Sequence, residues 1–214
     1  MSSQIRFVCE FGVGMMAGRR RADTMEENRR KLIAAARRAF AGHGFAKASM
    51  DELTAEAGLT RGALYHGFGD KKGLLAAVVA EVDGEMAARA QRAGEAAPSA
   101  WEGLMAEGAA YISMALDPEI RRIVLLDGPA FLGDPSQWPS QSACLEVTLA
   151  TVARLIDDGT MRPVDVEAAA RLLNGAALNA ALWVAASTTP RQTLPKAVEA
   201  FRLMASGFLA RPPQ

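Results

Sequence analysis

The chain has 214 residues, half of them hydrophobic, with 24 Lys and Arg against 24 Asp and Glu, so its formal net charge is zero. A chain of this length can bury a core in one large domain or in two domains of unequal size. Two widely separated cysteines, Cys9 and Cys144, exclude a disulfide framework and a zinc site with paired cysteine spacing. They fit a reducing, cytoplasmic location.

The zero net charge conceals an uneven distribution along the chain. Residues 16–80 contain twelve Lys and Arg against seven Asp and Glu, a net charge of +5, whereas residues 81–214 contain eleven against sixteen, a net charge of −5. This pattern is expected where only the front of a chain meets a polyanion. The longest run without charge, Leu172 to Pro190, includes Asn174 and Asn179, so we interpret it as a buried helix and expect no membrane partner.

The pattern of apolar residues predicts an all-α fold. Apolar positions recur at intervals of three and four, alanine is abundant, and alternating β-branched residues are nearly absent. Capping chemistry marks four helix starts, namely Ser49 with Glu52, Ser99 with Glu102, Asp117 before a proline and Asp134 before a proline. We expect about nine helices, at residues 25–42, 49–57, 60–67, 70–95, 99–116, 118–126, 135–158, 165–187 and 194–210.

Two of these short helices flank Gly58 with the spacing of a helix-turn-helix. A glycine is favoured there because the chain leaves the first helix through a left-handed residue, which costs a side chain about 1 kcal/mol. Thr54, four residues earlier, stands where the crossing of the second helix favours a small residue, and we expect its hydroxyl to face a backbone carbonyl. The apolar stripe of the helix at 25–42 closes a three-helix unit.

The segment from Ala34 to Val78 resembles the N-terminal domain of TetR/AcrR-type regulators. The family pattern is met at Gly58, Leu59, Thr60, Ala63, Leu64, Tyr65, Phe68, Lys71, Leu74 and Leu75. One departure is Gly67, which stands where the family often has a histidine, although His66 precedes it. The resemblance implies a homodimeric repressor that binds double-stranded operator DNA, is released by a small apolar or amphipathic effector, and needs no cofactor or metal.

This resemblance sets the expected domains. We expect a flexible basic arm at residues 1–24, whose Arg19, Arg20 and Arg21 could enter a minor groove, and a helix-turn-helix DNA-binding domain at 25–80. A helical regulatory, ligand-binding and dimerisation domain follows at 81–214.

The residues of the second short helix agree with a DNA-binding role on physical grounds. Thr60 caps the helix, Arg61 in its first turn can reach base edges, and Gly62 lets the backbone approach DNA. Tyr65, one turn later, and Lys71 resemble the phosphate-binding tyrosine and lysine of the family. The predicted DNA-binding residues are Lys47, Ser49, Thr60, Arg61, Gly62, Tyr65, His66 and Lys71.

The resemblance continues more weakly from Asp117 to Gly133 and implies no particular ligand. It also implies that the last two helices form the dimer interface, and their apolar residues recur at intervals of four and three, as in a helical seam. The predicted interface residues are Leu173, Ala176, Ala180, Trp183, Val198, Phe201, Ala205 and Phe208. The alternative is that these seams face the core of their own chain.

Candidate effector contacts are aromatic, sulfur-containing or amide residues of the middle and later helices, although such residues also serve as ordinary packing. They are Trp101, Met105, Tyr111, Met114, Phe131, Trp138, Cys144 and Asn174, with Asn179 as an alternative polar anchor. We expect no enzymatic activity, because the only histidines, His43 and His66, lie in the DNA-binding domain and no metal-ligand or phosphate-loop spacing occurs. A constitutive DNA-binding regulator without a ligand is the alternative function.

Overall fold

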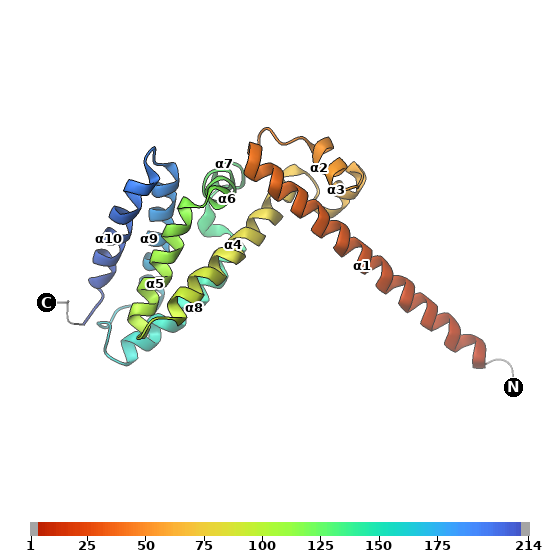
Figure 1. The fold of residues 1–214 in the computed structure, drawn as a ribbon. Coiled ribbons are helices and arrows are strands. Elements are labelled where there is room, and N and C mark those ends of the chain that lie inside the picture. The colour runs from red at the N-terminus through yellow and green to blue at the C-terminus, as the bar shows by residue number, and fades with distance from the viewer. Residues whose placement is uncertain (1–3, 211–214) are drawn as a thin grey trace.

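The computed structural model describes the backbone of residues 4–210 and the side chains of residues 22–210. Its N-terminal unit consists of α1 (Gln4–His43), α2 (Met50–Glu56), α3 (Arg61–Phe68) and the start of α4 (Lys71–Glu95). Figure 1 shows α4 leaving this unit and running into a second group of helices, the C-terminal unit. Within the described backbone no β-strand forms, and one isolated bridge joins Met161 to Leu209.

The C-terminal unit is built from longer helices and a broken middle segment. Its long helices are α5 (Ala100–Ser113), α8 (Pro139–Asp157), α9 (Val166–Ala186) and α10 (Pro190–Ser206). Helices α5 and α8 pack against α4, and α9 packs against α5, α8 and α10. The middle segment comprises the 3₁₀ turn η1 (Met114–Leu116), α6 (Pro118–Ile120), the π-helical stretch η2 (Arg121–Asp127), α7 (Gly128–Leu132) and the 3₁₀ turn η3 (Pro135–Gln137). None of the helices in the described part of the chain combines the length and apolarity of a membrane span.

A small apolar core holds the N-terminal unit together. Phe40 of α1, Leu53 of α2, Leu64 of α3 and Leu74 of α4 are all buried in it. Their spacing on each helix leaves one face for solvent, which is the amphipathic pattern that the sequence predicts. The start of α1 differs from the prediction, because the helix begins at Gln4 and not near residue 25. The predicted arm residues Arg19, Arg20 and Arg21 lie outside the described side chains.

The capping predictions are confirmed at two sites and wrong at one. The hydroxyl of Ser99 accepts a hydrogen bond from the Glu102 amide at 3.2 Å, and the carboxylate of Asp117 accepts one from the Glu119 amide at 3.0 Å. Ser49 stands at the N-cap of α2, but its side chain makes no capping hydrogen bond. The first turn of α2 therefore begins without the expected contribution of about 1 kcal/mol from a capped amide.

The helix predicted from residue 135 begins later. Asp134 caps only the turn η3, and α8 starts at Pro139. A residue before proline is driven to an extended conformation by the proline ring, and Trp138 accordingly has φ −74° and ψ 145°. The chain therefore leaves η3 at Trp138 and starts a new helix. The helix predicted at 118–126 is likewise divided between α6 and η2, and sequence periodicity does not distinguish a π-helical stretch from an α-helix.

Candidate DNA-binding surface and ligand cavity

The turn between α2 and α3 has the geometry that the sequence predicts. Gly58 has φ +66°, the left-handed conformation that glycine adopts without a steric penalty. The hydroxyl of Thr54 lies 3.0 Å from the Met50 carbonyl oxygen, so the buried threonine donates to its own helix. Thr60 caps α3 by accepting from the Ala63 amide. The helix-turn-helix is thus fixed from both sides of the turn.

The outward face of α3 carries the predicted contact residues. Arg61, Gly62, Tyr65 and His66 are exposed, and Tyr65 keeps 52% of its surface accessible although it is aromatic. The guanidinium of Arg61 forms a two-pronged ion pair with Asp51 of α2. This hydrogen bonding lowers the pKa of Asp51 and raises the pKa of Arg61. Arg61 lies in the first turn of α3, and the ion pair holds its side chain against α2.

Packing within the chain does not require a glycine at position 62. A Cβ built on it would meet only the Thr60 hydroxyl oxygen, at 3.7 Å, which is ordinary contact. Glycine inside a helix costs about 0.5 to 1 kcal/mol relative to alanine. The folded chain would therefore be more stable with alanine, and packing within the chain does not explain the glycine.

Lys71 lies at the start of α4 and is half-buried. Its ammonium sits 4.6 Å from the centre of the Phe45 ring and 3.4 Å from the Ala46 carbonyl oxygen. Burial lowers the pKa of Lys71. The other two residues predicted near this edge, Lys47 and Ser49, are exposed and half-buried respectively. Lys47 and Ser49 precede the first residue of α2, and Lys71 is the first residue of α4.

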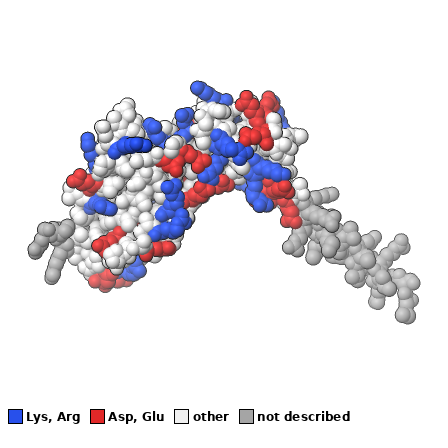
Figure 2. Space-filling model, in the orientation of Figure 1, with Lys and Arg blue, Asp and Glu red and all other residues white. Residues whose placement is uncertain are grey.

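The surface of the N-terminal unit is not uniformly basic. Figure 2 shows Lys and Arg interleaved with Asp and Glu on the side of the unit that faces the viewer. Pairs such as Arg38 with Glu56, at 2.7 Å, account for part of this alternation. The net charge of +5 over residues 16–80 is therefore spread among interleaved positive and negative side chains. For DNA binding, the local arrangement of charges on α3 matters more than this total.

A cavity of about 320 Å³ lies in the C-terminal unit between α4, α5, α8 and α9. The wall from α4 is made of small residues, Gly84, Ala87 and Ala90, whose spacing of three puts them on one face of the helix. Gln91, one position further along, adds an amide. The cavity is therefore mainly apolar, with a few polar groups, as is usual for sites that bind small molecules.

Three of the eight predicted effector contacts line this cavity, namely Tyr111, Cys144 and Asn174. The other five lie elsewhere for reasons of packing. Trp138 is buried against Gly128, where a Cβ would come within 2.7 Å of its ring, and Phe131 lies 4.5 Å from the Phe45 ring, measured between ring centres. The remaining residues lie outside the cavity lining, and they are Trp101, Met105 and Met114. The alternative anchor Asn179 is exposed in a groove between α9 and α10.

Three polar residues at the cavity were not predicted from the sequence, namely Glu107 and Gln141, which line it, and Asp83, which lies behind it. A signal for Asp83 was present, because it interrupts the buried apolar stripe that includes Val79, Val82 and Met86. A charged residue on the buried face of a helix is rare unless it has a partner or a ligand.

An arginine joins α1 to the C-terminal unit. The guanidinium of Arg37 donates to Glu119 of α6 at 2.8 Å, to Glu85 of α4 at 2.6 Å and to Glu81 of α4 at 3.0 Å. We call Arg37, Glu81, Glu85 and Glu119 the Arg37 cluster. Hydrogen bonding to Glu119 and Glu85 raises the pKa of Arg37, while Arg37 lowers the pKa of Glu85. The cluster connects α1 with two elements of the other unit.

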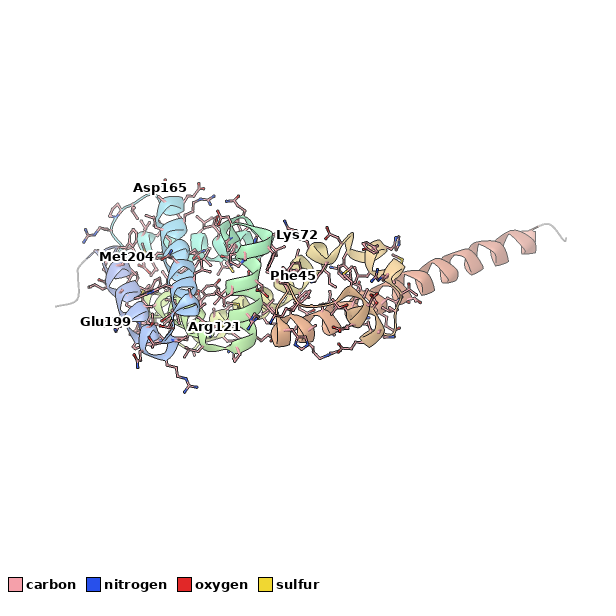
Figure 3. The ribbon with its side chains drawn as sticks, turned by 90° about the horizontal axis from the view of Figure 1, so that it is seen from above. Phe45, Lys72, Arg121, Asp165, Glu199 and Met204 are labelled. Carbon is pink, nitrogen blue, oxygen red and sulfur yellow. The ribbon has the colours of Figure 1, made fainter. Side chains whose placement is uncertain are left out.

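A second contact between the units lies after the end of α1. The Phe45 amide donates to the carboxylate of Asp127 in η2 at 2.7 Å, and Figure 3 shows Phe45 at the junction of the two units. At the other end of η2, Arg121 donates to the carbonyl oxygen of Ala185, at the end of α9, at 2.6 Å. The stretch η2 therefore connects α9, which lines the cavity, to the segment between α1 and α2.

The predicted interface residues divide into buried and accessible groups. Leu173, Phe201 and Ala205 are buried in their own chain, and a Cβ on Gly108 would collide with the Phe201 ring. Trp183 is 51% exposed. The other four predicted residues are half-buried, and they are Ala176, Ala180, Val198 and Phe208.

Three further apolar side chains of α9 and α10 are exposed. Leu172 is 62% exposed and Leu203 is 73% exposed, and Met204 is also exposed. Leu172, Met204 and Ala176 line a groove between the two helices. Figures 1 and 3 show that α9 and α10 lie at the opposite end of the molecule from α1.

Two family models match this chain. "Bacterial regulatory proteins, tetR family" matches residues 32–78, and "Tetracyclin repressor-like, C-terminal domain" matches residues 101–208. The HTH-type transcriptional repressor AcnR of Corynebacterium glutamicum is 30% identical over 148 residues, which cover 67% of this chain and 76% of that repressor.

Solved structures have the same fold. A TetR-family transcriptional regulator from Pectobacterium atrosepticum is 46% identical, with a TM-score of 0.82, over 89% of this chain and 98% of the other. The regulator FadR from Bacillus subtilis, solved in complex with stearoyl-CoA, is 18% identical, with a TM-score of 0.66, over 83% of this chain and 97% of the other.

Proposed function

The chain belongs to the TetR family of bacterial transcriptional regulators, and on that premise we propose that it is a homodimeric repressor released from a palindromic operator by a small molecule. Family membership identifies a DNA-binding regulator and not an enzyme. Repression, dimerisation and release by an effector belong to the proposal.

One observation carries the effector response. Helix α4 begins at Lys71 beside the recognition helix α3 and provides Gly84, Ala87 and Ala90 to the cavity wall. A ligand that changes the position of α4 in the cavity must also act on the unit that contacts DNA. Release follows when the ligand binds more tightly to the conformation that does not fit the operator. FadR, with its bound stearoyl-CoA, is a protein of this fold that holds a small molecule.

The proposed DNA contacts are the exposed residues of α3 and its flanks. Arg61 reads base edges, the hydroxyls of Tyr65 and Thr60 contact phosphates, and Lys71 neutralises a phosphate after leaving the Phe45 ring. The remaining contacts proposed are Lys47, Ser49, Gly62 and His66. A dimer presents two recognition helices about one helical turn of DNA, ~34 to 36 Å, apart.

The test uses the intergenic DNA that flanks the gene, in gel-shift and footprinting experiments with the purified chain. We expect protection of a palindrome, and we expect the double variant Arg61→Ala with Tyr65→Ala to lose the specific complex. Arg154→Ala removes an exposed arginine of α8, far from α3, and serves as the control. Unchanged affinity in the double variant would refute the assignment of α3. Operator binding that no compound alters would favour a constitutive regulator.

A further inference from the structure

The polar groups that line the cavity are either acidic or neutral. Glu107 supplies a carboxylate, and the neutral groups include Tyr111, Gln141 and Asn174. No Lys, Arg or His is among the residues that line the cavity in the described part of the chain. An anionic ligand would therefore find no cation to pair with, and burying an unpaired charge is costly.

Asp83 adds a second carboxylate behind this wall. Its side chain is only 1% exposed, and it accepts a hydrogen bond from the Gln141 amide at 3.2 Å. Among the described residues it has no cationic partner. Buried carboxylates are ordinarily paired with a cation or a metal, so Asp83 lies beside the cavity without the counter-ion that such a group usually has.

Glu107 also lies in the cavity wall and forms no ion pair with any described residue. Its side chain lies in space left by Gly94 of α4, since a Cβ there would collide with the Glu107 carboxylate. Burial and the charge of Glu95 raise the pKa of Glu107. Burial, together with Asp83 and Glu107, also raises the pKa of Cys144. Two carboxyl groups without an ion-pair partner among the described residues therefore lie at or behind the cavity wall.

The Tyr111 hydroxyl gives an independent indication that a polar group of a ligand binds in the cavity. The hydroxyl of Tyr111, which lines the cavity, is buried, and although the Gln141 amide lies near it, no described group meets hydrogen-bond geometry with it. Leaving a buried polar group unsatisfied costs about 1 to 3 kcal/mol. Tyr111 and Glu107 are one turn apart on α5, so they share a face and a single polar head can reach both.

We propose that the effector is an amphipathic organic cation, a protonated or quaternary amine with an apolar body, whose head lies by Glu107 and Tyr111. This inference rests on the proposed function and names the ligand class of that cavity. The apolar body packs against Ala87, Ala90 and Leu104. The Asp83 carboxylate stabilises the positive head through its field, and the Tyr111 hydroxyl accepts a hydrogen bond from a protonated amine.

The test compares ligands that share one apolar body and differ only in the head. Decylamine, decyltrimethylammonium, 1-decanol and decanoate, each below its micelle concentration, are titrated calorimetrically into the full chain without DNA. We expect the two cations to bind at least about tenfold more tightly than decanol, because their positive heads attract the Glu107 carboxylate and a neutral head does not, and we expect decanoate not to bind detectably. Decanol or decanoate binding as tightly as the cations would overturn the proposal.

The residue assignment is tested by variants. Glu107→Gln should weaken decyltrimethylammonium about tenfold and leave decanol unchanged, and Asp83→Asn should act in the same direction. Glu146→Gln removes an exposed carboxylate of α8 and controls for the overall charge. Cation affinity that is unchanged in Glu107→Gln would overturn the assignment. If either decanoate or decanol binds the chain as tightly as the cations and also releases operator DNA, the cation class is wrong while the proposed effector response stands. If none of the four compounds binds, the cation proposal also fails.

Discussion

In the recognition helix α3, Gly62 makes the folded chain less stable than an alanine at the same position would. The Cβ of an alanine at position 62 has room in the free chain, so the glycine is not explained by packing. In contrast, Gly58, with φ +66°, is required by the turn itself. These two glycines lie four residues apart. The turn requires Gly58, and we propose that Gly62 lets a DNA backbone approach the helix.

We predict that Gly62→Ala stabilises the chain and weakens operator binding. The unfolding free energy should rise by about 0.5 to 1 kcal/mol, because alanine loses less backbone entropy in a helix. Operator affinity should fall about tenfold, the equivalent of one lost contact. Gly42→Ala, at another exposed helical glycine with no neighbour within 4 Å, is the control and should stabilise without loss of binding. Urea denaturation and gel shifts measure both, and equal binding by the two variants would contradict the interpretation.

At the level of elements, the Arg37 cluster and the Asp127 contact connect the two units. Arg37 donates to carboxylates on both α4 and α6, whereas the neighbouring Arg38 pairs with Glu56 of α2, inside its own unit. The two arginines are adjacent in sequence and equal in charge. They therefore make a natural comparison for the coupling between units.

We predict that Arg37→Met reduces the effect of an effector on operator binding without changing effector affinity in the absence of DNA. Removal of the guanidinium leaves three carboxylates facing one another, so the contact of α1 with α4 and α6 should open. The ratio of operator affinities without and with effector is measured by gel shift. Arg38→Met should leave this ratio unchanged. An equal ratio in both variants would exclude the Arg37 cluster from coupling.

The same cluster predicts a pH dependence of stability. Arg37 lowers the pKa of Glu85 in the folded chain below its value in the unfolded chain, about 4.3. The folded state therefore gains stability above that pH and loses it as pH falls through the lower folded value. The difference in unfolding free energy between the natural chain and Arg37→Met should accordingly be larger at pH 7 than at pH 3. Thermal denaturation at both pH values measures it, and a constant difference would contradict the ionic origin.

The helix-turn-helix was predictable because its determinants are local. Gly58, Thr60 and Leu64 act within one or two turns of each other, and their spacing alone specifies the turn, the cap and the core face. The cavity was only partly predictable. Its small residues on α4 become a wall only through packing against α5 and α8, and the position of Phe201 beside Gly108 likewise depends on packing between α5 and α10. Periodicity identifies a buried face but not the element that covers it.

At the scale of the whole molecule, the exposed apolar side chains of α9 and α10 predict where two copies meet. Leu172 and Leu203 are more than half exposed, so changing them does not disturb the core of the chain. We predict that Leu172→Glu with Leu203→Glu yields a folded monomer in sedimentation, because four carboxylates would face one another across a twofold interface. Met25→Glu, at an exposed apolar residue of α1, should stay dimeric. A dimeric double variant would place the interface elsewhere.

The effects of the effector and the operator on each other's affinity must be equal, and this reciprocity links the two units thermodynamically. If the effector lowers operator affinity 100-fold, the coupling free energy is ~2.7 kcal/mol, and the operator must lower effector affinity by the same factor. Calorimetric titration of the tightest-binding decyl compound into the free dimer and into the dimer saturated with operator measures that factor directly. The two factors should agree, and both should approach one in Arg37→Met because the Arg37 cluster then no longer holds α1 to α4. A compound that binds equally tightly in both titrations yet displaces the operator would be acting by competition for DNA or by unfolding, and not through the cavity.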